Sequence, residues 1–393
     1  MKLKEKKLSS VVSTILLVLA LISLLGVNGI KNLVGEDVEK ALIIMGVVIL
    51  ACFFFTFAKD IKVDLLSVLF IVYQLIILFS TLFSGEFTYG IGISILSFIL
   101  IFLLVQSNLY GQIITILSIL VFVVSLINLP FVFIDGLKAT DSFFIGGKNA
   151  LNIFLLPAMF IMLLKGFEKK SKYTVIAIIG VVVSLITMFI ASGATGKVVA
   201  LASVVLLLLI IKIRPAKWIF IGVIVAVYIL LVSGILVETQ IWQQIADKLG
   251  KNANLTYRTD VWESVRVMVA EKPLFGYGRV NEISYVTDWG GTVILNEAHN
   301  FALEIALEGG IISVIIYLFM LFRGVAGLNL KLLSHKIIFV AFCLVLINGL
   351  TESINNKFLV VVIFAIVCRF CSEEKDRKKL ELERIEGQKE NEG

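Results

Sequence analysis

MKLKEKKLSSVVSTILLVLALISLLGVNGI, residues 1–30, begins the chain with basic residues followed by one long apolar run. Similar runs recur through the 393 residues, of which 59% are hydrophobic and 16% charged, and the mean hydropathy is +1.02. Soluble domains contain only about 45–50% apolar residues, so this composition indicates an integral membrane protein. The runs are longer than the roughly ten alternating residues of a barrel strand, which predicts an all-α, multispanning fold.

Twelve apolar segments are predicted to cross the membrane. The first resembles a secretory signal, but it lacks an obvious cleavage site and further spans follow, so we expect it to remain as a helix. Several spans are short for a hydrocarbon layer roughly 30 Å thick, and ten or eleven spans would also fit. The twelve are residues 9–29, 41–58, 65–84, 91–107, 113–134, 150–165, 174–192, 198–213, 218–237, 308–322, 337–350 and 357–371.

The basic residues predict the orientation of these spans. Lysine and arginine concentrate in alternate connections and in the tail from Lys375, which places those segments and both termini in the cytoplasm. We therefore divide the chain into nine transmembrane helices (1–237), a large extracytoplasmic loop with short surface helices (238–307), three further helices (308–371) and a charged cytoplasmic tail (372–393). The net charge of +6 reflects this inward bias and gives no argument for nucleic-acid binding.

The sequence indicates neither a metal site nor another cofactor. Cys368 and Cys371 form a C-x-x-C pair, but no second pair and no nearby histidine accompany them. The acidic residues expected on the outer face show no recognisable spacing of metal ligands.

The long outer loop contains a predicted helix at residues 259–272. Asp260 and Glu263 are placed to form a capping box at its start, and Pro273 ends it. An apolar stripe together with Trp262 is typical of a helix lying on the membrane surface. A connection of this length inside a membrane protein is usually functional, so we look there for the site.

NEAHNFALEIALEGG, residues 296–310, contains one of only two histidines in the chain. Asn296 is a candidate N-cap for a helix that starts at Glu297, which would place His299 in the first turn. The helix dipole there disfavours a second proton on the ring, and a neutral imidazole can act as a general base. An interfacial histidine without chemistry is the alternative. The same helix would carry one polar face, made of Asn300, Glu304 and Glu308.

A further candidate is Lys197, in the short outer turn ASGATGKVVAL at residues 191–201. A cation at the membrane boundary is costly unless it snorkels or meets an anion. Backbone amides of the Gly193–Gly196 turn would add to an anion site, as helix starts often do.

These patterns together resemble the O-antigen ligase/O-antigen (Wzy-type) polysaccharide polymerase superfamily. The resemblance covers residues 190–325 and rests on R-x-x-x-W, then K-P-L-F-G-Y-G, then H-N-x-x-L-x-x-x-x-x-x-G. The residues that carry it are Arg258, Trp262, Pro273, Gly276, Gly278, His299, Asn300, Leu303 and Gly310.

Two upstream segments extend the resemblance. FFIGGKNALNIFLLP, residues 143–157, resembles the family's glycine–asparagine segment and singles out Asn149 and Lys148. The family's Ser-Arg turn aligns with Gly196-Lys197, a departure that matters because lysine cannot hold a phosphate in a bidentate fork.

The resemblance implies a membrane glycosyltransferase that polymerises polyprenyl-pyrophosphate-linked oligosaccharide repeat units into a capsule, exopolysaccharide or O-antigen. The reaction would take place on the outer face of the cytoplasmic membrane, without a nucleotide sugar or a required metal. His299 would accept the proton of the attacking hydroxyl, and the cations Arg258 and Lys197 would stabilise the pyrophosphate leaving group. A flippase, a chain-length regulator and membrane lipid are the implied partners. The remaining substrate-binding candidates are Asn149, Lys148, Trp262, Asn300, Arg279 and Glu304.

Two alternatives remain open. A ligase of the same family would move a finished glycan to a lipid, wall or protein acceptor, and it would share the same motifs. A polysaccharide transporter would instead carry ionisable groups at mid-span, whereas nearly all the charge here lies at span edges.

Overall fold

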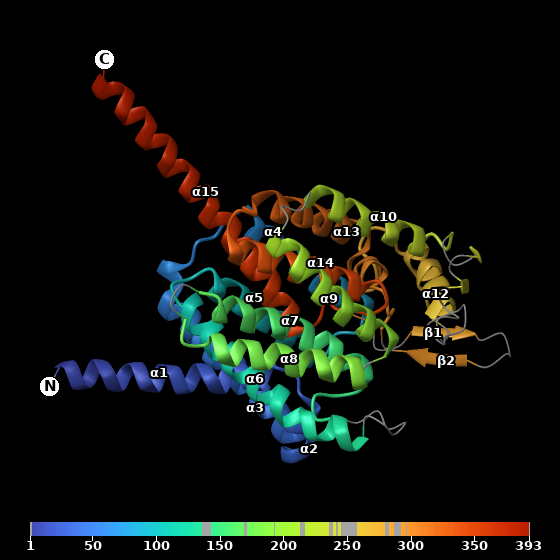
Figure 1. Cartoon of the computed structure of the whole chain (residues 1–393). Helices are drawn as coiled ribbons and strands as arrows, with labels where there is room; N and C mark the ends of the chain where they lie inside the picture. Colours follow the sequence, from blue (N-terminus) through green and yellow to red (C-terminus); the bar gives the residue numbers. More distant parts are fainter. Residues whose placement is uncertain are drawn as a thin grey trace.

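The computed structural model describes residues 2–135, 143–168, 171–191, 193–212, 217–235, 239–240, 243–244, 258–279, 283–286, 292–295 and 297–392. These residues form a bundle of helices with one small hairpin at its edge (Figure 1). The helices are α1 (Lys2–Leu24), α2 (Asn28–Val34), α3 (Glu36–Phe57), the 3-10 turn η1 (Ala58–Asp60), α4 (Leu65–Ser84), α5 (Tyr89–Val105), α6 (Tyr110–Asp135), α7 (Lys148–Gly166), α8 (Thr174–Ala191), α9 (Ala194–Lys212), α10 (Lys217–Val232), α12 (Arg258–Glu271), α13 (Phe301–Gly327), α14 (Leu333–Gly349) and α15 (Phe358–Glu392).

The apolar helices make this a multi-pass membrane protein. Six helices of the described chain are long and apolar enough to cross a membrane, and the pair α1–α2, bent by 102°, would form a seventh span. Four shorter apolar helices accompany them, at Tyr89–Val105, Ala194–Leu209, Lys217–Val232 and Leu333–Gly349. Each of the twelve predicted spans overlaps at least one helix of the structure, while the count of twelve crossings stays a prediction.

The two ends of the bundle differ. Figure 1 shows the N- and C-termini together at one end, here called the terminal end, and α12 with the hairpin at the other, here called the hairpin end. This arrangement fits the expectation that both termini lie on one side of the membrane.

The all-α fold class is confirmed, and one small hairpin that the sequence did not predict accompanies the helices. Strand β1 (Ile283–Val286) pairs antiparallel with β2 (Thr292–Leu295), and Ile283 lies opposite Leu295. The signal in the sequence is two short runs, ISYV and TVIL, which are rich in β-branched and aromatic residues and flank a Gly-Gly pair. Apart from this hairpin, the described secondary structure is helical.

Helices α7 and α14 lie at the centre of the bundle, next to the candidate site described in the following subsection. They pack against each other, and α7 is also covered by α6 and α8. A helix enclosed in this way is largely apolar all round, and Phe160 of α7 and Phe339 and Phe342 of α14 are almost fully buried. One polar contact joins the two helices, where Asn152 Nδ2 donates to Asn348 Oδ1 at 2.6 Å.

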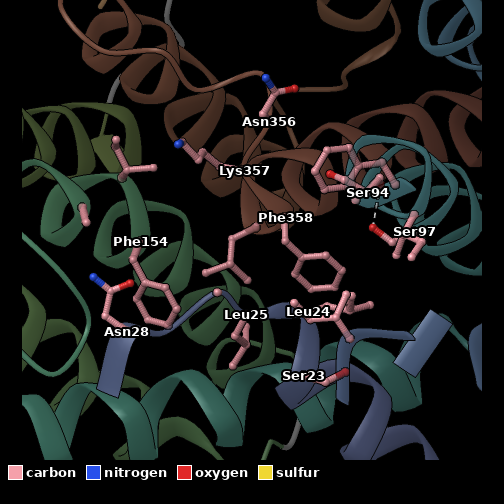
Figure 2. Close-up of a pocket in the computed structure, with 18 of the residues that line it drawn as sticks. Ser23, Leu24, Leu25, Asn28, Ser94, Ser97, Phe154, Asn356, Lys357 and Phe358 are labelled. Carbon is pink, nitrogen blue, oxygen red and sulfur yellow. Dashed lines mark hydrogen bonds between the residues drawn. The ribbon is translucent and has the colours of Figure 1, made fainter. Parts of the chain in front are cut away.

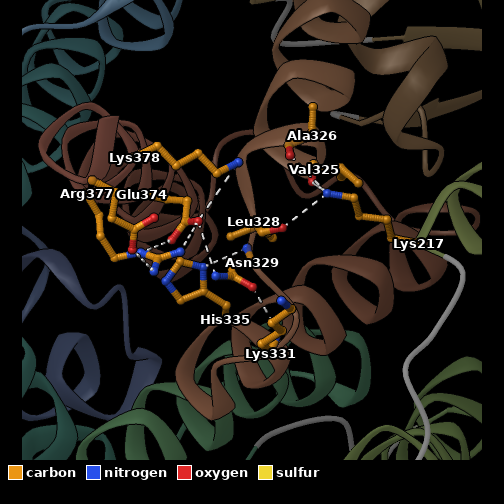
Figure 3. A network of polar contacts seen from close by, with 11 residues as sticks. Lys217, Val325, Ala326, Leu328, Asn329, Lys331, His335, Glu374, Arg377 and Lys378 are labelled. Atoms are coloured by element: carbon orange, nitrogen blue, oxygen red, sulfur yellow. Dashed lines mark hydrogen bonds and ion pairs between the residues drawn. The ribbon is translucent and has the colours of Figure 1, made fainter. Parts of the chain in front are cut away.

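A separate polar network closes the terminal end (Figure 3). Lys217 Nζ donates to the carbonyls of Val325, Ala326 and Leu328 at 2.9, 2.9 and 3.1 Å, and so caps the last turn of α13. The following connection is tied to α15 because Asn329 Nδ2 donates to Glu374 Oε1 at 3.2 Å. This network lies at the opposite end of the bundle from the candidate site.

Candidate functional site

Helix α13 begins at Phe301, and Asn300 is its N-cap. The Asn300 Oδ1 atom accepts from the backbone N–H groups of Ala302 and Leu303 at 3.0 and 3.1 Å. The predicted helix start at Glu297 is therefore wrong, and the proposed cap Asn296 lies outside the described residues. Asn300 is the N-cap because its buried side chain accepts hydrogen bonds from two free N–H groups of the first helical turn. It also donates to the Leu350 carbonyl at 3.0 Å.

His299 consequently precedes the helix instead of lying in its first turn. Its φ of 49° makes it the one non-glycine residue of the described chain with a positive φ. Such a conformation costs on the order of 1–3 kcal/mol and is often found at functional sites. The imidazole is 25% exposed, and its Nδ1 atom lies 3.6 Å from Glu352 Oε2, without a hydrogen-bond partner of its own.

Glu352 is the residue that the sequence interpretation missed. It lies in the connection between α14 and α15, residues 350–357, and its side chain is only 2% exposed. Arg258 Nη2 donates to Glu352 Oε1 at 2.8 Å, while Oε2 faces His299. Arg258 also donates to the Thr351 carbonyl. One buried carboxylate thus joins the predicted general base to the predicted cation.

A carboxylate in this position has a defined chemical effect. It can hold an imidazole in one orientation and stabilise the imidazolium that forms when the ring accepts a proton. The signal for it is the polar segment TESINNK, residues 351–357, between two apolar runs at the predicted outer face.

The predicted polar face of α13 holds the 350–357 connection in place. Glu304 Oε2 accepts from Ser353 Oγ at 2.8 Å and from the Ala298 N–H at 2.6 Å. One turn further along, the Glu308 carboxylate accepts from Asn355 and Asn356 at 2.5 and 2.7 Å. Both glutamates are buried and bond to side chains of this connection, and substrate binding by Glu304 and Asn300 stays a prediction.

The K-P-L-F-G-Y-G segment, residues 272–278, packs its backbone into a kink in α13. The kink is at Gly310, whose φ is 63°. The Tyr277 and Gly278 N–H groups donate to the Leu307 and Glu308 carbonyls at 2.7 and 2.9 Å, and the Ile311 N–H donates to the Pro273 carbonyl at 2.8 Å. The segment therefore supplies partners for backbone groups that the kinked helix leaves free.

Glycine is required on both sides of this contact. A Cβ atom on Gly276 would lie 2.3 Å from the Leu307 carbonyl oxygen, and one on Gly310 would lie 2.2 Å from the Leu274 carbonyl oxygen. Both glycines also have a positive φ. The spacing of the motif thus follows from close backbone packing.

Arg279 leaves this segment and enters the bundle. Its N–H donates to Thr81 Oγ1 at 2.9 Å, and Nη1 donates to Ser94 Oγ at 3.1 Å. Its Nε atom lies 3.5 Å from Glu308 Oε1, and the side chain is 10% exposed. The guanidinium therefore lies behind the wall of the site, and its substrate-binding role stays a prediction.

His299 and Glu352 line a cavity of about 570 Å³. Asn149, from the first turn of α7, lines the same cavity, as do Glu297 and Lys357, whose Oε1 and Nζ atoms lie 2.7 Å apart. Figure 2 shows Asn356 and Lys357 at the top of the view, with Phe154, Leu25 and Phe358 below them among polar side chains such as Asn28 and Ser23. The cavity lining is therefore mixed, with both polar and apolar side chains.

Lys197 and Lys148 lie near this cavity without being part of its wall. Lys197 is exposed on the first turn of α9, and Lys148 begins α7 directly before Asn149. The α9 turn reaches the site through Thr195, whose Oγ1 atom lies 2.8 Å from that of Thr351. Helix ends that are distant in sequence therefore meet at the hairpin end.

Helix α12 packs against other helices of the protein, whereas the sequence predicted that it lies on the membrane surface. It begins at Arg258, so Asp260 is not its cap, and Glu263 pairs with Arg266 instead of closing a capping box. Trp262 is 1% exposed and packs with Leu303 and Leu307 of α13. The predicted membrane-surface face of this helix therefore covers α13 and the end of α10, and Trp262 is enclosed there.

The comparisons with known proteins bear on the central part of this arrangement. Residues 179–318 match the family model described as O-antigen ligase, and no curated protein matches the chain. The matched segment includes Lys197, Arg258 and His299 but ends before Glu352. The predicted resemblance is confirmed over this segment, and the chain carries a domain of the O-antigen ligase/polymerase superfamily.

Proposed function

We propose that the protein polymerises polyprenyl-pyrophosphate-linked oligosaccharide repeat units into a cell-surface polysaccharide on the outer face of the cytoplasmic membrane. The observation that carries this proposal is the row His299–Glu352–Arg258 beside a cavity at one end of a membrane helix bundle. In glycosyl transfer from a pyrophosphate donor, a base can take the proton of the acceptor hydroxyl and a cation can stabilise the leaving group. The apolar helices place the protein in the membrane, where a lipid-linked donor also resides.

In the proposed reaction, His299 acts as the general base and Glu352 stabilises its protonated form. The acceptor hydroxyl gives its proton to His299 as its oxygen bonds to the anomeric carbon of the donor sugar. The bond from that carbon to the pyrophosphate oxygen breaks, and polyprenyl pyrophosphate leaves with the electron pair. Glu352 stabilises the protonated His299, which later returns the proton to solvent.

Charge on the leaving group would be met by Arg258 and Lys197. Arg258 is held at the site by Glu352 and the Thr351 carbonyl, so its guanidinium is already oriented. Lys197, exposed on the α9 turn that contacts Thr351, would supply a second cation as a point charge. Asn149 in the cavity wall would donate to hydroxyl groups of the glycan. No cofactor is assigned a role.

A second candidate is a ligase that transfers a finished glycan to another acceptor. The observation that favours it is the family match itself, whose description is O-antigen ligase. The same base, carboxylate and cations would serve both reactions, because the two differ only in the acceptor.

Alanine variants of His299, Arg258 and Lys197, made in a cell that produces the native polymer, test the proposal. For a polymerase, each variant would accumulate single lipid-linked repeat units, whereas for a ligase long unattached chains would accumulate. Arg266→Ala is the matched control, because Arg266 lies on the same helix as Arg258 but pairs with Glu263. Wild-type polymer from all three site variants, at normal protein levels, would overturn the assignment.

A further inference from the structure

Asn356 lies in the wall of the cavity beside His299 (Figure 2). It belongs to the 350–357 connection, and its Nδ2 atom donates to Glu308 Oε1 at 2.7 Å. The preceding residue, Asn355, donates to the other carboxylate oxygen, Oε2, at 2.5 Å but does not line the cavity. Two neighbouring asparagines thus share one buried partner, and only one of them reaches the space beside the histidine.

The contact with Glu308 determines which way round the Asn356 amide lies. The Glu308 side chain is 1% exposed, and its carboxylate faces three donors, namely the two asparagine amides and Arg279, whose Nε atom lies 3.5 Å from Oε1. An ionised carboxylate fits between three donors, and it can only accept hydrogen bonds. Each asparagine therefore turns its NH2 group toward Glu308. The opposite orientation would place the amide oxygen against the carboxylate.

This orientation leaves the Asn356 Oδ1 atom as a free acceptor. No group of the described chain donates a hydrogen bond to it. The Oδ1 atom of Asn355 also has no hydrogen-bond partner within the described ranges, but it is enclosed by protein. Because Asn356 lines the cavity, its oxygen is available to a ligand there, and that of Asn355 is not.

The charged neighbours of Asn356 in the cavity wall are already paired. Lys357 Nζ lies 2.7 Å from Glu297 Oε1, and Glu352 accepts from Arg258 at 2.8 Å. Asn356 adds a neutral acceptor beside these pairs. A ligand that displaces water from this oxygen must supply a donor of its own, because an acceptor that is covered and left unpaired costs free energy.

We propose that Asn356 is a specificity-determining residue, whose Oδ1 atom accepts a hydrogen bond from one O–H or N–H group of the sugar that binds beside His299. The inference rests on the proposed function, because it takes the ligand of this cavity to be a sugar of the lipid-linked repeat unit. It adds the chemical group that the cavity selects, which is a neutral hydrogen-bond donor.

Two substitutions separate this contact from packing. Asn356→Leu keeps a similar size but removes the acceptor. Asn355→Leu is the matched control, because each variant takes one donor away from Glu308 and only Asn356→Leu changes the cavity wall. Both variants and the wild type are assayed as purified protein reconstituted into membranes.

The substrates are the native polyprenyl-pyrophosphate-linked repeat unit and a set of analogues. In each analogue one O–H or N–H group of the sugars is replaced by a group that cannot donate. We expect at least one analogue to lose about tenfold in kcat/KM with the wild type, the size of one hydrogen bond. Asn356→Leu should lose about tenfold with the native unit and show no further loss with that analogue. Asn355→Leu should keep the wild-type pattern across the set.

The outcomes distinguish a direct contact from a change in structure. An analogue whose loss disappears in Asn356→Leu but persists in Asn355→Leu supports the proposal and identifies the donor as a hydroxyl or an N–H group. The proposal is overturned if every analogue loses as much in Asn356→Leu as in the wild type. Equal losses in the two asparagine variants would also overturn it, because the shared contact with Glu308 would then be the cause. Failure of the proposed function would appear differently, as unchanged turnover of the native unit in His299→Ala.

Discussion

The Nδ1 atom of His299 lies 3.6 Å from a carboxylate oxygen of Glu352, although one residue precedes α13 and the other follows α14. The second carboxylate oxygen is bonded to Arg258 at 2.8 Å. Because Glu352 is nearly inaccessible to water, its charge acts on both neighbours with little screening. Three side chains from three separate segments are therefore held next to one another at the candidate site.

Replacing Glu352 by Gln should lower kcat by about 100-fold with a smaller change in KM, because the amide cannot stabilise a protonated His299. Glu352→Asp, which keeps the charge, should recover part of the loss. Steady-state kinetics with the lipid-linked substrate checks this. Equal kcat for the Gln variant and the wild type would show that Glu352 takes no part in proton transfer.

Replacing Arg279 by Ala should reduce the free energy of unfolding by about 2–3 kcal/mol, because it leaves the buried Glu308 carboxylate without its nearby cation. The double variant Arg279→Met, Glu308→Gln should be more stable than Arg279→Ala, since neither charge is then buried alone. Thermal unfolding in detergent gives the comparison. A double variant less stable than the single one would contradict this account.

Replacing Gly276 or Gly310 by Ala should destabilise the protein by more than about 3 kcal/mol, because a Cβ atom at either position overlaps backbone atoms that cannot move away. Gly111→Ala and Gly222→Ala are the matched controls, since nothing lies within 4 Å of a Cβ atom there. The yield of folded protein and its melting temperature measure the difference. Similar values for the two pairs would remove the close-packing explanation of the motif.

Replacing Lys217 by Met should destabilise the protein by about 1–3 kcal/mol, because three carbonyls at the end of α13 lose their donor. The kcat of the folded fraction should stay at the wild-type value, since the contacts of Lys217 are with the end of α13 and include none of the candidate site residues. Melting temperature and kcat are measured on the same preparation. A large fall in kcat at unchanged stability would contradict this separation.

The fold class and several candidate residues could be predicted because they depend on local patterns. Long apolar runs identify membrane helices, and each predicted span overlaps a helix of the structure. The hairpin was missed because its strands are four residues each, too short for a clear period-two pattern. The start of α13 was placed too early because Asn296 and Asn300 are equally good caps by sequence.

Contacts between distant segments account for what the sequence left undecided. Tryptophan is typical of membrane surfaces, which is why Trp262 was predicted to lie there. Only its packing against Leu303 and Leu307 shows that it is enclosed by protein. Glu352 has no motif around it that marks a partner, and its role follows from lying between His299 and Arg258.

The sequence by itself determined that this chain is a bundle of membrane helices with an O-antigen ligase-type segment, because hydrophobic runs and motif spacing are properties of neighbouring residues. Only the tertiary structure decided that α13 uses Glu304 and Glu308 to hold the 350–357 connection, and that this connection carries Glu352 to His299. The physical reason is that burial and hydrogen-bond partners depend on which helix ends meet in space.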